Sequence, residues 1–180
     1  ERGYGITRQI LEVLQECRHP VGIVTKSALI ARDADILSAM AEQHLARAYI
    51  SITTLDGSLA RRMEPRAPTP AKRLKAIEAL AKAGVPVGVM FAPIIPGLND
   101  HEMEDVLQAS HDAGATTGGY VLLRLPLEIK DLFREWLEAQ YPDRAGRVIT
   151  LVRDCRGGRD YDAEWGKRLK GTGPFADMVA

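Results

Sequence analysis

Four short apolar runs alternate with segments of helical period along the chain. The runs are rich in Val, Ile, Leu and aromatic residues, and they cover Val21–Lys26, Ala48–Leu55, Pro86–Ala92 and Gly119–Leu125. Near-continuous apolar runs of this length are typical of strands that are covered on both faces. Because helical segments between strands form crossover connections, the pattern predicts a parallel sheet.

The segments between the runs repeat their apolar residues every three to four positions, as amphipathic helices do. In the clearest of them, Thr69 is expected to cap the helix, Pro70 suits its first turn and Gly84 closes it. Further helices are predicted at residues 7–17, 33–44, 99–114 and 127–141. The predicted order is therefore helix and strand in alternation, beginning and ending with a helix.

This order predicts an α/β protein, either a doubly wound sheet or a partial (β/α) TIM-like barrel. A complete eight-stranded barrel takes roughly 250 residues, and this chain has 180. We expect residues 1–140 to form the barrel portion and residues 141–180 to form a helical C-terminal extension. In both architectures ligands bind at the C-terminal ends of the strands, so the candidate chemistry is sought there.

Composition excludes several classes of protein. The chain has 24 basic and 24 acidic residues, which argues against a globally basic nucleic-acid binder. No apolar run approaches the roughly 20 residues of a membrane span, and the N-terminus does not resemble a signal peptide. The two cysteines, Cys17 and Cys155, lie far apart, which favours a reducing cytoplasm. We expect a cytoplasmic protein without membrane contact.

Polar residues follow the first two predicted strands. Lys26 follows the first strand, and three roles are open for it. It would bind a ligand carboxylate or phosphate through its charge, act as a Schiff-base nucleophile if its amine is desolvated, or lie in a solvated loop without a specific role. By alternation, Ser51 and Thr53 share one face of the second strand. Their hydroxyls suit the polar mouth of a barrel, and equally they suit a core in which they satisfy each other.

Two proline-rich stretches follow the second and third strands. In the first, Arg61, Arg62 and Arg66 flank Glu64, as in a stiff loop that holds an anion or in an exposed salt-bridged loop. The second is "PIIPGLND", in which the prolines fix φ and Gly97 permits close approach of the backbone. With its two isoleucines, this stretch would suit one face of a planar aromatic ligand.

Assembled, these strand ends resemble the C-terminal part of radical SAM proteins, most closely an uncharacterised branch similar to spore photoproduct lyase. The segments that carry the resemblance are "HPVGIVTKS", "ISITTLDGSLARRMEPRAPTPAKRLKAIEALAKAGVPVGVMFAPIIPGLND" and "DCRGGRDYDAEWGKRLKGTGPFADMV". The resemblance implies a partial barrel, a [4Fe–4S] cluster and S-adenosylmethionine. It also implies reductive cleavage of S-adenosylmethionine and hydrogen abstraction from a substrate, as in an oxidoreductase or a lyase.

The resemblance also implies roles for individual positions. Lys26 would contact the methionyl carboxylate of S-adenosylmethionine, with Arg66 near the same end, and Ser51 would lie near the ribose. Thr53, on the same face of the strand as Ser51, is also expected to bind the cofactor. The adenine would be flanked by residues after the third and fourth strands, namely Pro93, Ile95, Gly97, Asn99, Leu123 and Arg124.

The sequence departs from the family at the cluster. The Cys-x₃-Cys-x₂-Cys loop is absent, and Cys17 and Cys155 do not replace three thiolate ligands. We therefore expect that the chain is the C-terminal part of a larger protein, that by itself it binds no cofactor, and that it has neither catalytic nor metal-binding residues.

The expected partner is the missing N-terminal part of the same barrel. The open edge of the first strand would otherwise pair with a second copy of the chain. Two other functions stay open from the residues alone. One is a class I aldolase-like barrel that uses Lys26, and the other is a nucleic-acid binding module in the basic and aromatic tail.

Overall fold

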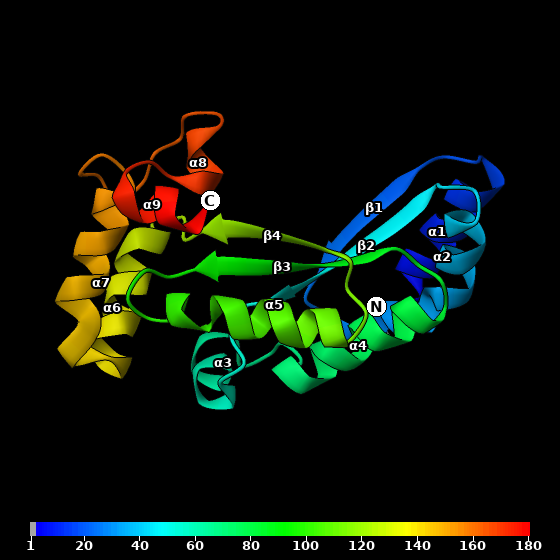
Figure 1. Ribbon diagram of the computed structural model, residues 1–180, viewed down its shortest axis with the longest axis horizontal. Coiled ribbons are helices and arrows are strands. Elements are labelled where there is room, and N and C mark those ends of the chain that lie inside the picture. The colour runs from blue at the N-terminus through cyan, green and yellow to red at the C-terminus, as the bar shows by residue number, and fades with distance from the viewer. Residues whose placement is uncertain (1–2) are drawn as a thin grey trace. The chain divides into compact units, whose positions relative to one another are not determined.

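The computed structural model describes residues 3–180 and contains an α/β fold (Figure 1). The strands are β1 (Val21–Thr25), β2 (Ala46–Ile52), β3 (Val87–Ile94) and β4 (Thr117–Leu122). They form one parallel sheet in the order β1-β2-β3-β4. The predicted fold class is thereby confirmed, and a four-stranded parallel sheet with flanking helices is consistent with a partial TIM-like barrel.

Helices connect the strands and form the C-terminal region. Before β3 they are α1 (Ile6–Glu16), the 3₁₀ helix η1 (Ala28–Asp33), α2 (Ala34–Ala41), α3 (Gly57–Met63) and α4 (Pro70–Lys82). After β3 they are the 3₁₀ helix η2 (Asp100–Glu102), α5 (Met103–Asp112), α6 (Ile129–Gln140), α7 (Pro142–Asp154), α8 (Lys167–Lys170) and α9 (Pro174–Val179). Each helix within residues 3–180 is too short or too polar to cross a membrane.

The chain divides into two compact units. The first runs up to Met90 and includes Asp105–Gly119, and the second consists of Phe91–Glu104 and Tyr120–Ala180. The two units therefore share β3, β4 and α5 along the chain. The division at residue 140 that the sequence suggests stays a prediction.

In the first unit, β1 is an edge strand. It pairs with β2 in the register Val21↔Ala46 to Thr25↔Ile50, and Figure 1 shows α1 and α2 beside this pair. The side chain of Val24 on β1 is 64% exposed. Helix α1 buries Leu11 and leaves a stripe of three apolar side chains exposed, Ile6, Ile10 and Val13.

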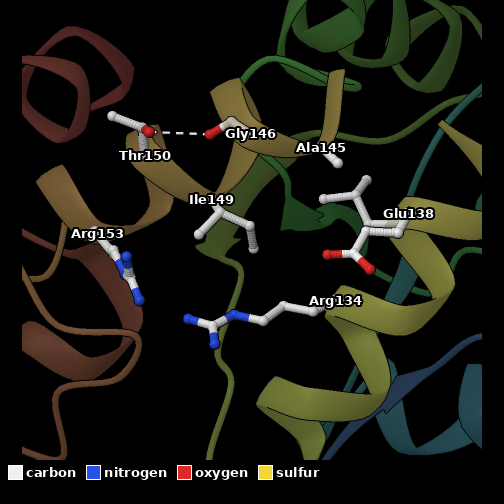
Figure 2. A pocket seen from close by; sticks show the side chains of 8 residues that line it. Arg134, Glu138, Ala145, Gly146, Ile149, Thr150 and Arg153 are labelled. Carbon is white, nitrogen blue, oxygen red and sulfur yellow. Dashed lines mark hydrogen bonds between the residues drawn. The ribbon is translucent and has the colours of Figure 1, made fainter. Parts of the chain in front are cut away.

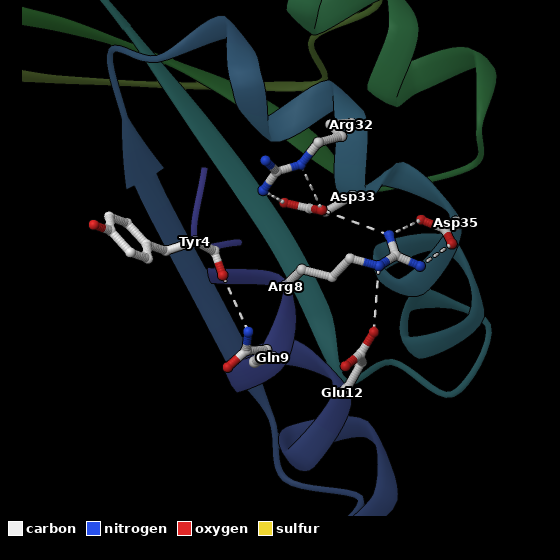
Figure 3. Close-up of polar contacts among 7 residues, drawn as sticks. All are labelled: Tyr4, Arg8, Gln9, Glu12, Arg32, Asp33 and Asp35. Atoms are coloured by element: carbon white, nitrogen blue, oxygen red, sulfur yellow. Dashed lines mark hydrogen bonds and ion pairs between the residues drawn. The ribbon is translucent and has the colours of Figure 1, made fainter. Parts of the chain in front are cut away.

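Arg8 attaches α1 to α2 through charged side chains (Figure 3). Its Nη1 and Nη2 donate to the two carboxylate oxygens of Asp35 at 3.0 and 2.7 Å. The same guanidinium lies 3.3 Å from Glu12 and 3.6 Å from the buried carboxylate of Asp33. This bidentate geometry fixes α1 more firmly than a single surface ion pair would.

One segment that the sequence analysis treated as a loop contains a helix. Residues 57–63 form α3, because the Asp56 side chain accepts a hydrogen bond of 2.7 Å from the Ser58 N–H and so caps its first turn. The sequence suggests a loop here because the arginines and prolines of residues 61–70 show no apolar helical period. Helix α4 begins at Pro70 as predicted, and it buries Arg73, Ala76, Ile77 and Leu80.

In the second unit, the tail is held at the end of β4. The buried guanidinium of Arg156 donates to the carbonyl oxygens of Leu122, Leu123 and Lys167 at 3.3, 2.9 and 2.9 Å. Gly171 has φ +74°, and a Cβ atom there would lie 2.9 Å from the carbonyl oxygen of Cys155. The polar tail is thus packed by specific main-chain contacts.

Candidate functional site

Lys26 lies at the C-terminal end of β1 and is held by two side chains. Its Nζ donates to Thr53 Oγ1 at 3.2 Å and forms an ion pair with Glu64 Oε1. Thr53 follows β2, so the ends of two neighbouring strands supply this contact. The Lys26 side chain is 37% exposed, which leaves its ammonium group accessible from solvent.

Glu64 joins this lysine to a buried arginine. Its Oε1 accepts from Lys26 and, at 3.1 Å, from Thr53 Oγ1, while its Oε2 forms an ion pair with Arg73 Nη2. The remaining groups of the Arg73 guanidinium donate to the carbonyl oxygens of Pro68 and Ser51, each at 2.9 Å. The Glu64 and Arg73 side chains are 12% and 2% exposed. We call Lys26, Thr53, Glu64 and Arg73 the Lys26 cluster.

The Lys26 cluster carries one net positive charge, because two cations surround one carboxylate. Burial by itself would raise the pKa of Glu64, but hydrogen bonds from Lys26 and Arg73 lower that pKa below its ordinary value. Glu64 is therefore ionised at neutral pH. The excess positive charge at the ends of two parallel strands suits an anionic ligand group, and the accessible donor for it is Lys26.

Ser51 and Arg66, the two other polar residues predicted to bind the same ligand as Lys26, lie at different positions from each other. Ser51 is 6% exposed, and its carbonyl oxygen is the acceptor for Arg73. Arg66 is exposed and lines a hollow of about 410 Å³ with residues at the start of η1 and in and before α4, namely Ser27, Ala28, Leu29, Ala67, Pro68 and Lys72. Glu64, which the sequence placed among Arg61, Arg62 and Arg66, instead pairs with Arg73.

The loop after β3 is shaped from within by Asn99. The Asn99 Oδ1 accepts from the Ile95 N–H at 2.7 Å, and its Nδ2 donates to the Pro93 carbonyl oxygen at 3.0 Å. Gly97 has φ +76°, a left-handed conformation that glycine adopts without the strain a side chain would bring. Ile95 and Asn99 are completely buried, whereas Pro93 and Gly97 are partly exposed.

Main-chain groups at the end of β4 have partners within the second unit. The Leu123 N–H donates to the Ile94 carbonyl oxygen at 2.8 Å, and the Leu123 carbonyl oxygen accepts from Arg156. Arg124 donates to the Tyr161 hydroxyl at 3.0 Å and its guanidinium lies 5.7 Å from the centre of the Tyr161 ring. Arg124 therefore connects the end of β4 to the tail.

A second hollow, of about 390 Å³, lies between α6 and α7 (Figure 2). The side chains of Arg134 and Arg153 extend toward each other there. Both donate to the same oxygen of Asp160, at 2.7 and 2.8 Å. These arginines are thus engaged in holding the tail segment around Asp160 against the two helices.

Comparison with known proteins identifies the family of this chain. The model of the radical SAM superfamily matches residues 3–109, which include β1, β2, β3 and the whole Lys26 cluster. The chain belongs to the radical SAM superfamily.

Several uncharacterized proteins are similar to this radical SAM chain. Protein Rv2578c of Mycobacterium tuberculosis is 31% identical over 155 residues, which are 85% of this chain and 46% of that protein. Protein MJ0683 of Methanocaldococcus jannaschii is 28% identical over 146 residues, or 79% of this chain and 52% of that protein. The ORF301 protein of Acidianus two-tailed virus is 38% identical over 93 residues, or 52% and 30%. The chain thus spans about half the length of the first two relatives.

The superfamily implies S-adenosylmethionine and a [4Fe–4S] cluster, and the radical SAM chain fits them unequally. The Lys26 cluster offers a charge and a donor that suit a carboxylate of S-adenosylmethionine. For the iron–sulfur cluster the residues do not fit, because residues 3–180 contain no group of three His, Cys, Asp or Glu side chains that could hold a metal. Cys17 is exposed and Cys155 is buried, and both are free.

The two other functions that the sequence left open are not favoured. A Schiff-base lysine needs a neutral amine, whereas the Lys26 ammonium is paired with the ionised Glu64. In the tail, Arg153 is paired with Asp160, which also pairs with Arg134 of α6, and Lys167 is paired with Glu164. These pairs leave less free positive charge for a nucleic acid than the sequence suggested.

Arg73, the buried centre of the Lys26 cluster, was not among the site residues predicted from the sequence. The signal was present in the spacing, because Arg73 stands three, four and seven positions before Ala76, Ile77 and Leu80. That spacing places it on the buried face of α4. A basic residue on such a face must find buried acceptors, which here are Glu64 and two carbonyl oxygens.

Proposed function

We propose that this chain is part of a radical S-adenosylmethionine iron–sulfur enzyme and that Lys26 binds the methionyl carboxylate of S-adenosylmethionine. The observation that carries the proposal is the partly exposed Lys26 side chain, whose ammonium is held by Thr53 and Glu64 at the ends of two parallel strands. Ser51 would lie near the ribose. The adenine contacts expected of Pro93, Ile95, Gly97, Asn99, Leu123 and Arg124 stay predictions.

When bound, S-adenosylmethionine supplies a 5′-deoxyadenosyl group for hydrogen abstraction from a substrate, in an oxidoreductase or lyase reaction. Residues of this chain bind and orient it. Lys26 neutralises the carboxylate of S-adenosylmethionine, and Thr53 and Glu64 fix the position of the Lys26 ammonium. The iron–sulfur ligands would come from a part of the protein beyond the printed sequence. We propose accordingly that the chain alone cleaves no S-adenosylmethionine.

The experiment is a pair of measurements on the intact protein and on the isolated chain. With a reconstituted cluster and a reductant, the intact protein is expected to convert S-adenosylmethionine to 5′-deoxyadenosine, and the isolated chain is not. Lys26→Met in the intact protein should weaken the binding of S-adenosylmethionine by about tenfold, as for the loss of one charged hydrogen bond. Full affinity in Lys26→Met would overturn the proposal.

A second proposal concerns the open edge of β1. The sheet order leaves this edge without a strand partner among residues 3–180, and Val24 on it is 64% exposed. Relatives such as Rv2578c are about twice as long as their matched region. We propose that another strand of the intact protein covers this edge and that a second copy of the chain covers it when the chain is alone.

A further inference from the structure

The residues that hold the Lys26 side chain, Thr53 and Glu64, are more deeply buried than Lys26 itself. A lysine side chain is long and flexible, and ordering it on ligand binding costs conformational entropy. Here Thr53 and Glu64 take two of its three N–H donors. One donor is left for a ligand, and its direction is fixed before the ligand arrives.

Glu64 alone would make a poor partner for this purpose. A lysine paired with a single carboxylate is electrically neutral and would not attract a second carboxylate. Arg73 changes this balance, because its buried guanidinium pairs with the other oxygen of Glu64 and restores one positive charge to the group. Arg73 is in turn fixed by the carbonyl oxygens of Pro68 and Ser51.

We propose that Glu64 and Arg73 are positioning residues, which hold the Lys26 ammonium at the end of β1 for a ligand carboxylate. This inference rests on the proposed function, because it takes the carboxylate of S-adenosylmethionine as the ligand group. Neither residue touches the ligand: Arg73 acts through Glu64, and Glu64 acts through Lys26.

The test compares two probes that differ only in the amino-acid end. S-adenosylhomocysteine carries the carboxylate and methylthioadenosine lacks it, and the dissociation constant of each is measured with the intact protein. Glu64→Gln is expected to weaken the binding of S-adenosylhomocysteine by about tenfold and to leave the binding of methylthioadenosine unchanged. Glu78→Gln is the matched control, because Glu78 is an exposed glutamate on α4, the helix that carries Arg73, and it pairs with Lys82 outside the Lys26 cluster.

A double-mutant cycle separates positioning from a general loss of structure. If Glu64 acts through Lys26, Glu64→Gln should have no further effect on S-adenosylhomocysteine in a Lys26→Met background. Should Glu64→Gln fail to fold, Glu64→Asp replaces it, because the shortened carboxylate keeps its charge and is expected to show the same selective loss.

The outcomes distinguish the two hypotheses. If Lys26→Met weakens neither probe, or weakens both equally, the proposed function fails. Suppose instead that Lys26→Met weakens the binding of S-adenosylhomocysteine alone. Only the positioning role then fails if Glu64→Gln tightens the binding of S-adenosylhomocysteine, weakens the binding of both probes or has no effect. Tighter binding in Glu64→Gln would mean that Glu64 competes with the ligand for Lys26.

Discussion

The guanidinium of Arg73 donates a hydrogen bond of 2.9 Å from Nη1 to the carbonyl oxygen of Ser51. This bond joins helix α4 to the end of strand β2. Because Arg73 is 2% exposed and also pairs with Glu64, it is a buried cation on which three segments of the first unit depend.

Removal of this cation should destabilise the fold. Arg73→Met leaves Glu64 largely buried without its counter-ion and two carbonyl oxygens without a donor, so the free energy of unfolding should fall by about 3 kcal/mol. Arg73→Lys, which keeps the charge but loses the forked geometry, should cost less. Urea denaturation measures both, and a loss below about 1 kcal/mol in Arg73→Met would contradict the buried-pair interpretation.

Asn99 should stabilise the loop after β3. Asn99→Ala leaves the Ile95 N–H and the Pro93 carbonyl oxygen without partners, and we expect a loss of about 2 kcal/mol in the free energy of unfolding. Hydrogen exchange at the Ile95 amide should become faster. An unchanged exchange rate at the Ile95 amide in Asn99→Ala would contradict this role of the Asn99 side chain.

Two glycine substitutions are expected to change stability in opposite directions, one in the loop after β3 and one in helix α7. Gly97→Ala forces a side chain into φ +76° and places its Cβ 3.1 Å from Leu151, so it should destabilise the chain by about 1–2 kcal/mol. Gly146→Ala lies in α7 with open space around it, and there it should stabilise by about 0.5–1 kcal/mol. Thermal unfolding of both variants checks this difference, which would be absent if Gly97 tolerated a side chain.

The Arg8–Asp35 pair should make stability depend on acid pH. Hydrogen bonds from Arg8 lower the pKa of Asp35 to about 2 in the folded chain. Since the folded pKa lies below the unfolded one, the contribution is complete above about pH 4 and is lost as the pH falls toward about 2. Asp35→Asn removes this contribution, so the wild-type and variant unfolding midpoints should converge over that range.

The effect of this pair should be small, because Asp35 is exposed to solvent and salt screens it. Arg8→Gln offers a check, since it should flatten the same part of the pH profile, and the double variant should add nothing further. A pH profile that Asp35→Asn leaves unchanged would mean that Arg8 does not hold the carboxylate in solution.

The edge of β1 should cause the isolated chain to self-associate. Val24→Lys places a charge on this edge and should shift sedimentation toward the monomer, because charged side chains discourage strand pairing. Leu127→Lys is the matched control, since Leu127 is 80% exposed and lies in the second unit, away from β1 in sequence. An isolated chain that is monomeric at all concentrations would contradict the proposed pairing.

Local patterns were enough to predict the sheet. Val21–Thr25 and Val87–Ile94 are apolar runs between turn residues, and such runs identify strands without knowledge of the rest of the chain. Helix α3 was missed because Asp56 can cap a helix or begin a turn, and only the hydrogen bond to Ser58 decides between them. The end of β2 was likewise placed three residues too late, at Leu55 instead of Ile52.

The candidate site was predictable in part. Lys26 and Thr53 were identified because both follow strands, and parallel strands bring their ends together. Arg73 was not, since its role depends on acceptors at Ser51 and Pro68 that are near it only in the folded chain. Asn99 was expected at a helix start or beside a ligand, whereas its amide is bonded within its own loop.

The Asn99 amide has a consequence for recognition. Because the bonds from its amide to Ile95 and Pro93 lie within the loop, the path of the backbone from Pro93 to Asn99 is set by the chain itself. A molecule that contacts this loop does not have to order it, so little backbone conformational entropy is lost on association. The rate of encounter, rather than a slow rearrangement, should then govern how fast such a molecule binds there.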